Sequence, residues 1–327
     1  MGFVLLFLHI GSQKTGTTAI QSFLHYNADL LRQAGFHYLK TGRAKINHNR
    51  MAASIKRGDG AKICADLTAE VTANPSEHYI ISSELFLRPG CKSLKQALPT
   101  DLISDIRIIC YLRRQDKFLE AMYKQRVKTG RAAPDRAAFL SARRDGLDYL
   151  RLIDEFAASF GERNIVVRPY ERRHFANGDV VEDFAHTIGL DLAPGVISQT
   201  SQSNKTLSVE VSEMLGSVSR HTSFNVREII REIIRLAPEG AIRSGDVYDR
   251  ATARDLVTQH ADGSEELRQR YCADIDQMFA TDDLDGTARA DDFSCEERLH
   301  QTQRAIEAVL QAIGNLEAAK IRLVSEH

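Results

Sequence analysis

A short loop near the N-terminus combines two glycines, one lysine and several hydroxyl side chains. Its sequence runs Gly11-Ser12-Gln13-Lys14-Thr15-Gly16-Thr17-Thr18. The loop lies between an apolar run and the start of a helical pattern, where free N–H groups and the helix dipole favour an anion. The glycines allow close approach of the backbone, the threonines supply hydroxyl donors, and Lys14 supplies a positive charge that can reach a leaving oxygen. We therefore predict a binding site for a phosphate or sulfate group.

The order of residues in this loop differs from the magnesium-nucleotide motif G-x-x-x-x-G-K-[ST]. Here Lys14 precedes Gly16 by two positions, and no serine or threonine follows a Gly-Lys pair to hold magnesium. The histidines also show no spacing typical of metal ligands. We expect an anion site that works without a metal ion.

Two residues are candidates for a general base. Glu84 follows the apolar run Ile80–Ile81, at the position where a strand of an open parallel sheet meets its ligand. A free glutamate has a pKa of about 4.3, so burial would have to raise the pKa of Glu84 for efficient proton transfer. His48 is the alternative, because it lies in a polar loop after the first helical pattern, where an acceptor can approach.

Apolar runs and helical patterns alternate in the first part of the chain. This alternation predicts an α/β fold with three layers and a central parallel sheet. Continuous apolar runs are typical of strands buried on both faces. The expected strands are Phe3–Ile10, His78–Ser82, Ile106–Leu112 and Ile165–Val167.

The pattern changes near residue 190, and beyond it we find helical patterns but no convincing strand. We expect an α/β core over residues 1–190 and an all-helical region over 191–327, with the polar stretch Gly195–Thr206 as a linker. Ser294 begins a capping-box pattern and a long helix. Apolar residues repeat along it at heptad-like spacing, namely Leu299, Ile306, Val309, Ile313, Leu316 and Leu323. This helix either packs on its own domain or forms a homodimer. The helical region 191–327 as a whole either covers the site of a second substrate, the acceptor, or serves as a dimerisation element.

The composition excludes several classes of protein. Lys and Arg total 43 and Asp and Glu total 44, so no overall basic excess favours nucleic acid as a partner. The five cysteines are widely spaced, which disfavours a disulfide framework and indicates a cytoplasmic protein. The N-terminal apolar run is too short to span a membrane and lacks the features of a signal peptide.

The run Lys14-Thr15-Gly16-Thr17-Thr18 resembles the 5′-phosphosulfate loop of sulfotransferases that use 3′-phosphoadenosine 5′-phosphosulfate (PAPS). With Gln13 and Ala19 added, it is similar to the version in heparan sulfate N-deacetylase/N-sulfotransferases and in many bacterial sulfotransferases. The resemblance implies a P-loop-like form of the three-layer fold. It also implies that Gly11, Gln13 and the residues from Lys14 to Thr18 bind the cofactor.

The second motif of that family is an arginine at a strand end, followed eight residues later by a serine and then by a tyrosine. Arg113 matches the arginine, which binds the 3′-phosphate in the family, and Tyr123 falls ten residues after it. Ala121 occupies the serine position, so one hydroxyl contact is missing. Arg114 is an alternative to Arg113 for this role and a candidate to compensate for the missing contact.

The resemblance extends more weakly to Val167–Arg172, Asn177–Asp179 and Asp183–Phe184, and so covers residues from about 5 to about 190. It implies a cytoplasmic sulfotransferase that moves a sulfuryl group from PAPS to a hydroxyl or amine of a saccharide or glycolipid. In that family the strand end matching Glu84 carries the catalytic histidine in cytosolic enzymes and a glutamate in other branches. Two other functions stay open: an ATP-dependent phosphotransferase and a non-catalytic nucleotide-binding scaffold.

Overall fold

The chain forms two compact units, each assembled from discontinuous segments. The computed structural model describes residues 5–87, 90–128, 136–192, 207–236, 238, 247–285 and 295–325. The first unit comprises Met1–Arg114, Asp148–Gln202 and Ala261–Phe279, and the second comprises Gln115–Leu147, Ser203–His260 and Ala280–His327. This partition differs from the expected division at residue 190. The division follows packing partners rather than chain order, because residues 115–147 group with the C-terminal helices and residues 261–279 group with the sheet.

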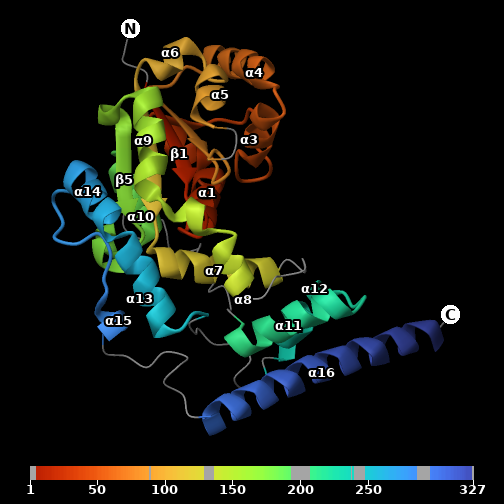
Figure 1. Ribbon diagram of the computed structural model, residues 1–327. Coiled ribbons are helices and arrows are strands. Elements are labelled where there is room, and N and C mark those ends of the chain that lie inside the picture. The colour runs from red at the N-terminus through yellow and green to blue at the C-terminus, as the bar shows by residue number, and fades with distance from the viewer. Residues whose placement is uncertain are drawn as a thin grey trace. The chain divides into compact units, whose positions relative to one another are not determined.

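A five-stranded parallel sheet forms the centre of the first unit (Figure 1). Its strands are β1 (Leu5–Gly11), β2 (Phe36–Tyr38), β3 (His78–Ser82), β4 (Ile106–Leu112) and β5 (Ile165–Pro169). They lie in the order β2-β3-β1-β4-β5, and every neighbouring pair is parallel. The predicted central parallel sheet is confirmed, and the carboxyl ends of all five strands meet at one edge.

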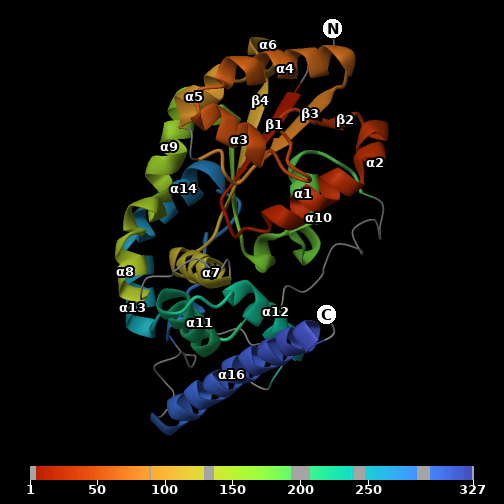
Figure 2. The same ribbon diagram turned by 90° about the vertical axis from the view of Figure 1, so that its right-hand side faces the viewer.

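Helices cover both faces of this sheet, which gives the three layers (Figure 2). One face packs against α1 (Thr17–Tyr26), α2 (Ala28–Gln33) and α10 (Val180–Thr187). The other packs against α3 (Asn49–Lys56), α4 (Gly60–Ala73), α5 (Cys91–Gln96), α9 (Tyr149–Phe160) and α14 (Ala261–Tyr271). Leu6, Leu8 and Ile10 of β1 face the second set of helices and Phe7 faces the first. Burial on both faces explains why β1 is a continuous apolar run.

The expected strand bounds agree closely with the structure, with one omission. The bounds of β3 and β4 are as predicted, and β5 extends two residues further than expected, to Pro169. The start of the first expected strand, residues 3–4, lies outside the described residues. The sequence pattern does not predict β2, because three residues after a helix end are too short to show a period.

Shorter elements connect these strands and helices. They are α6 (Thr100–Ile103) and the 3₁₀ turns η2 (Glu162–Asn164), η3 (Arg172–His174) and η4 (Ala176–Gly178). Gly161, with φ of 93°, ends α9.

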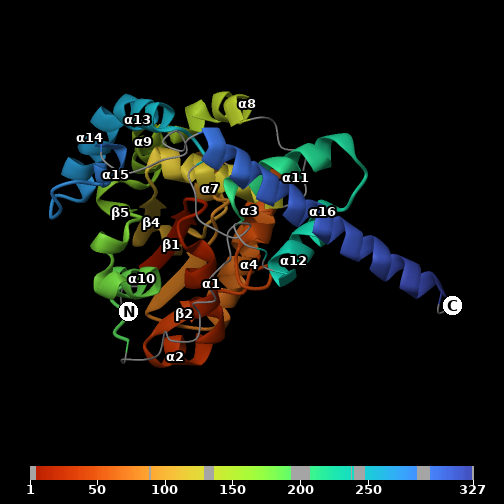
Figure 3. The same ribbon diagram turned by 90° about the horizontal axis from the view of Figure 1, so that it is seen from below.

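The named elements of the second unit are all helices within its described residues. Its elements are α7 (Gln115–Lys128), α8 (Arg136–Ser141), η1 (Arg144–Leu147), α11 (Val209–His221), α12 (Val226–Leu236), α13 (Arg250–Gln259), α15 (Asp282–Asp285) and α16 (Cys295–Ser325). Within this unit α11 and α12 both pack along α16 (Figure 3). None of the described helices of either unit combines the length and apolar character that a membrane crossing requires.

The long helix α16 buries a face of small residues and leaves other apolar side chains exposed. Ala305, Ala308, Val309 and Ala312 lie in the core of the second unit. By contrast, Leu299 and Ile321 of the same helix are more than half exposed. Of the heptad-like stripe, Val309, Ile313 and Leu316 pack on the helix's own unit. Ser294 and the stretch expected as a linker, Gly195–Thr206, lie outside the described residues.

Candidate functional site

The loop after β1 is fixed to the end of β4 by hydrogen bonds. Ser12 donates both its backbone N–H and its hydroxyl to the carbonyl oxygen of Tyr111, at 2.8 and 3.1 Å. The buried hydroxyl of Thr15 donates to the carbonyl oxygen of Ser12 at 2.6 Å. Thr15 therefore stabilises the loop from within. Gln13 and Lys14 are half-exposed, and Lys14 has a positive φ of 64°.

Glycine is required at the start of α1. Gly16 has φ of 71°, and a Cβ there would lie 2.9 Å from Val180 Cγ1 and 3.1 Å from Tyr170 Cε2. Because glycine has no side chain, α1 begins without a side-chain cap, as in loops whose backbone N–H groups bind phosphate. Thr17 is buried and Thr18 is exposed at this end of the helix.

Arg113, just past the end of β4, contacts the same loop. Its Nη1 donates to the carbonyl oxygen of Lys14 at 3.1 Å, and its Cζ lies 5.7 Å from the centroid of the Tyr170 ring. Burial raises the pKa of Tyr170, against the opposing effect of the Arg113 charge. The guanidinium is half-exposed, whereas the neighbouring Arg114 is buried, with 4% of its surface accessible. Arg113 is therefore placed against the loop.

Two residues of the expected second motif belong to the other unit. Tyr123 is 2% exposed on α7 and packs edge-on against Phe139, with ring centroids 5.4 Å apart. Ala121 lies on the same helix and is half-exposed. Tyr123 is therefore part of the core of the second unit.

Glu84 lies at the end of β3, directly beside the end of β1. A Cβ on Gly11, whose φ is 104°, would lie 3.0 Å from Glu84 Cα, so only glycine fits there. Both carboxylate oxygens of Glu84 accept hydrogen bonds from side-chain amides. Gln21 Nε2 donates to Oε2 at 3.0 Å, and Asn49 Nδ2 donates to Oε1 at 3.0 Å. The half-exposed carboxylate is thus oriented from two helices.

These amides belong to a larger set of polar residues that the sequence patterns do not single out. Gln21 Nε2 also donates to Ser82 Oγ at 3.2 Å, and His9 Nδ1 lies 2.8 Å from that hydroxyl. Burial lowers the pKa of His9 to about 4, against the raising effect of Glu84, so His9 is neutral near pH 7. Gln21 is buried on α1 together with Ile20, Phe23 and Leu24, and no local pattern of the sequence reveals that burial. Asn49 follows directly after His48, the residue that the sequence offers as the alternative candidate base.

His48 does not take the position expected of a base. The ring is fully buried, Nε2 lies 2.8 Å from the carbonyl oxygen of Leu39, and Nδ1 accepts from the backbone N–H of Ser82 at 3.1 Å. Burial lowers the pKa of His48 to about 4. Both ring nitrogens therefore bind backbone groups, and the residue joins the segment after β2 to the end of β3. The sequence cannot show this, because a polar neighbourhood in the chain does not reveal burial.

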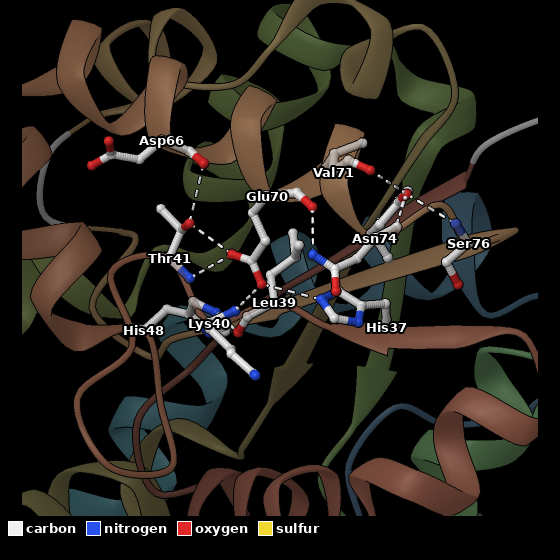
Figure 4. Close-up of polar contacts among 11 residues, drawn as sticks. His37, Leu39, Lys40, Thr41, His48, Asp66, Glu70, Val71, Asn74 and Ser76 are labelled. Atoms are coloured by element: carbon white, nitrogen blue, oxygen red, sulfur yellow. Dashed lines mark hydrogen bonds and ion pairs between the residues drawn. The ribbon is translucent and has the colours of Figure 1, made fainter.

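The segment after β2 is held by Glu70 of α4 (Figure 4). Glu70 accepts from the backbone N–H groups of Lys40 and Thr41 and from the Thr41 hydroxyl, each at 2.7 Å. His37 Nε2 lies 3.1 Å from the same carboxylate. Burial alone would raise the pKa of Glu70, but these hydrogen bonds outweigh it and lower the pKa to about 2. The carboxylate is therefore ionised wherever the protein is folded at ordinary pH.

Three neighbouring strands thus bring their functional side chains to one edge of the sheet. Glu84 follows β3, the Gly11–Thr18 loop follows β1 and Arg113 follows β4, and these strands are adjacent in the sheet. In the described residues, no group of three or more His, Cys, Asp or Glu side chains is arranged to hold a metal ion. The fold and site define a class: an α/β protein whose parallel sheet carries, at its carboxyl edge, a glycine-containing loop that leads into a helix without a side-chain cap.

Comparison with known sequences gives one relative and no family. No family model matches the chain. A stretch of 160 residues is 31% identical to an uncharacterized protein of Archaeoglobus fulgidus, and it covers 49% of this chain and 40% of that protein. The chain therefore spans about two fifths of the length of this relative.

Solved structures with partial similarity are a sulfotransferase and a retinol dehydratase. The sulfotransferase of Alicyclobacillus acidocaldarius is 14% identical with a TM-score of 0.38, over 58% of this chain and 87% of that one. A retinol dehydratase in complex with androsterone and the inactive cofactor PAP is 14% identical with a TM-score of 0.31, over 83% of this chain and 82% of that one. At these scores the similarity carries no weight for function.

We predict that Glu70→Gln destabilises the protein in a pH-dependent way. The folded-state pKa of Glu70 lies below its unfolded value of 4.5, so its stabilising effect is complete above pH 4.5 and is lost as the pH falls towards 2. At pH 7 the free energy of unfolding should fall by about 1.5–3 kcal/mol, the value of hydrogen bonds to a charged group. The deficit should shrink as the pH falls below 4.5.

Urea unfolding between pH 7 and pH 3 measures this difference. Asp66→Asn is the matched control, because Asp66 lies on the same helix with an exposed side chain. A deficit of the same size at every pH would show that Glu70 acts through packing rather than through its charge.

Proposed function

We propose that this protein is a sulfotransferase that uses PAPS. The observation that carries the proposal is the order of side chains along the sheet edge. A carboxylate, an anion-binding type of loop with a lysine, and an arginine follow three adjacent parallel strands. A sulfuryl transfer needs these three functions together: a base for the acceptor, positive charge for the leaving phosphate, and a contact that fixes the nucleotide.

The loop and the arginine suit a nucleotide that carries phosphate at both ends of its ribose. Gly16 leaves α1 without a side-chain cap, and a Cβ there would collide with Val180, so the backbone is the ligand-facing surface. In the proposal, Gly11, Gln13 and the residues from Lys14 to Thr18 surround the 5′-phosphosulfate. Arg113 binds the 3′-phosphate, and Thr15 supports the loop through Ser12.

In this proposal Glu84 is the base. Its two oxygens each accept one amide N–H, which fixes the plane of the carboxylate, and further lone pairs on these oxygens can accept a proton. When bound, PAPS supplies an activated sulfuryl group and departs as 3′-phosphoadenosine 5′-phosphate (PAP). Glu84 takes the proton of the attacking hydroxyl or amine, and Lys14 offsets the negative charge that develops on the leaving phosphate oxygen. His48, with both ring nitrogens bound to backbone groups, holds the neighbouring segment in place.

The acceptor in this proposal is a hydroxyl or amine of a saccharide or glycolipid. Ala121 in place of the family serine predicts that the 3′-phosphate receives fewer contacts than in that family. We propose that Arg113 supplies the main contact to this phosphate. The proposal includes a cytoplasmic location and makes no use of a metal ion.

Binding of PAP without metal is the first test. The loop offers no magnesium-binding hydroxyl after a Gly-Lys pair, so we expect PAP to bind equally well in EDTA and in magnesium. Isothermal titration calorimetry of PAP under both conditions, with ATP and magnesium in parallel, gives the comparison. Strict dependence on magnesium or a preference for ATP would instead support a phosphotransferase.

Arg113→Ala tests recognition of the 3′-phosphate. PAP and AMP differ by that phosphate alone, so the substitution should weaken PAP by about tenfold to a hundredfold, the effect of one charged hydrogen bond, and should hardly change AMP. Arg113 also binds the carbonyl oxygen of Lys14. Equal losses for PAP and AMP would mean that Arg113 acts only by supporting the loop.

Glu84→Gln separates proton transfer from binding. The substitution keeps the shape of the side chain but removes its ability to accept a proton, so turnover should fall by about 10²–10⁴-fold while PAP affinity hardly changes. The assay follows transfer of labelled sulfate from PAPS to a panel of bacterial glycans. Retained turnover in Glu84→Gln would exclude it as the base, and loss of PAP binding would place its role in nucleotide recognition.

A further inference from the structure

The segment around β2 is strongly basic within a chain of nearly neutral charge. Between Asp29 and Asp59 there is no acidic residue. The same stretch contains the basic residues Arg32, Lys40, Arg43, Lys45, Arg50, Lys56 and Arg57. The whole chain has a net charge of -1, so this stretch is a local exception. We call residues 40–50 the basic loop, because four of these side chains lie in it.

The basic loop has a defined backbone structure. Ala44 and Asn47 exchange backbone hydrogen bonds of 2.6 and 3.3 Å, and the Tyr38 hydroxyl donates to the carbonyl oxygen of Ile46 at 2.7 Å. Gly42 is indispensable, because a Cβ there would lie 2.5 Å from the Cβ of Met51. Together with the hydrogen bonds to Glu70, these contacts fix the backbone from which the basic side chains extend.

The cations of the basic loop are available to a ligand. Among the residues that the structure describes, no acidic side chain forms an ion pair with Lys40, Arg43, Lys45 or Arg50. Lys40, Lys45 and Arg50 are exposed. In Figure 4 the side chain of Lys40 points away from Glu70, which binds only its backbone N–H. The charges therefore face solvent.

Arg43 links the basic loop to the candidate base. Its Cζ lies 5.1 Å from the centroid of the Tyr38 ring, a cation–π contact that orders the guanidinium before any ligand arrives. Burial raises the pKa of Tyr38, the charge of Arg43 lowers it and the charge of Glu84 raises it again. Tyr38 thus lies within the fields of both charges. Asn49, at the end of the basic loop, donates directly to Glu84.

The order of the strands places the basic loop on the acceptor side of the base. Along the edge, the basic loop follows β2, Glu84 follows β3, the 11–18 loop follows β1, and Arg113 follows β4. At about 4.8 Å between neighbouring strands, β2 lies about 14 Å from β4. The nucleotide-binding residues of the proposed function all lie at β1 and β4. The cations beyond Glu84 therefore meet the other substrate.

We propose that the acceptor is an anionic saccharide, whose carboxylate or sulfate groups bind the basic loop while its hydroxyl or amine faces Glu84. This inference rests on the proposed function for the identity of the second substrate. An acceptor with negative charge is repelled by Glu84 and by an anionic cofactor, and the unpaired cations offset that repulsion. A neutral acceptor would leave four adjacent cations without a role.

Binding of oligo-alginate, a chain of uronic acids, tests the proposal, with dextran of equal length as the neutral control. We expect binding of oligo-alginate but not dextran, in the presence of PAP. The triple variant Arg43→Gln, Lys45→Gln, Arg50→Gln should weaken oligo-alginate by about tenfold, the summed effect of three exposed ion pairs. The matched control is Lys56→Gln, Lys62→Gln, Lys92→Gln, which removes three exposed cations outside the basic loop and should change affinity less than about twofold.

PAP affinity of the same variants separates this proposal from the proposed function. Unchanged PAP binding in the triple variant supports an acceptor site, and lost PAP binding would overturn it by assigning the basic loop to the nucleotide. Equal losses of oligo-alginate in both triple variants, or binding of dextran as well, would also overturn it. So would binding of phosphatidylglycerol vesicles in place of oligo-alginate. If PAP does not bind the unmodified protein but oligo-alginate binding still depends on the basic loop, the sulfotransferase proposal fails and the anionic saccharide site stands.

Loss of folding cannot mimic the expected result. The double variant Lys45→Gln, Arg50→Gln keeps Arg43 on the Tyr38 ring, and both altered side chains are exposed. It should fold normally and weaken oligo-alginate by about threefold to fivefold. Full affinity in this folded variant would count against the proposal.

Discussion

The parallel pairing of β3, β1 and β4 is the constraint on which the candidate site depends. The register pairs His9 with Ser82 and Gly11 with Cys110, which sets how far the chain runs past each strand before it reaches Glu84 or Arg113. A shift of one residue between β1 and β3 would separate Glu84 from Gly11 and turn the flanking side chains to the opposite faces. The close contact between Gly11 and Glu84 therefore depends on the register between β1 and β3.

The polar residues around Glu84 stabilise a carboxylate that is partly removed from water. A carboxylate that loses contact with water needs hydrogen bonds. An ion pair would supply them, but the cation would neutralise the charge of the carboxylate. Here neutral groups supply them instead: Gln21 and Asn49 each donate one amide N–H, and Gln21 is held in turn by Ser82. His9 adds to this set without adding charge, because burial keeps its pKa near 4. The negative charge of Glu84 is oriented but not paired with a cation by these groups.

The sequence predicts the parts of this arrangement that are local. A continuous apolar run followed by glycine, lysine and threonine residues is enough to place β1 and the loop after it. Likewise, the position of Arg113 follows from the end of a clear apolar run. By contrast, Gln21 and Asn49 matter because of where the strands bring Glu84, and no local pattern contains that information. The burial of His48 is likewise not predictable from the sequence, because its polar neighbours in the chain suggest exposure while the fold buries its ring completely. The strand β2 is missed for a simpler reason, since three residues cannot display a period.

Average composition hides the feature of this chain that, in the proposed function, most constrains the second substrate. Nearly equal numbers of acidic and basic residues argue against a partner recognised by overall charge. Recognition at a site, however, depends on charges within about one Debye length, roughly 10 Å at moderate salt. The basic loop gathers its cations at the end of β2, beside the one strand end that carries Glu84. Cations beside the carboxylate act on whatever approaches it, even though equal numbers of acidic residues elsewhere cancel them in the sum. In the proposed function, the local field at the edge of the sheet, rather than the net charge, is therefore the property that selects the acceptor.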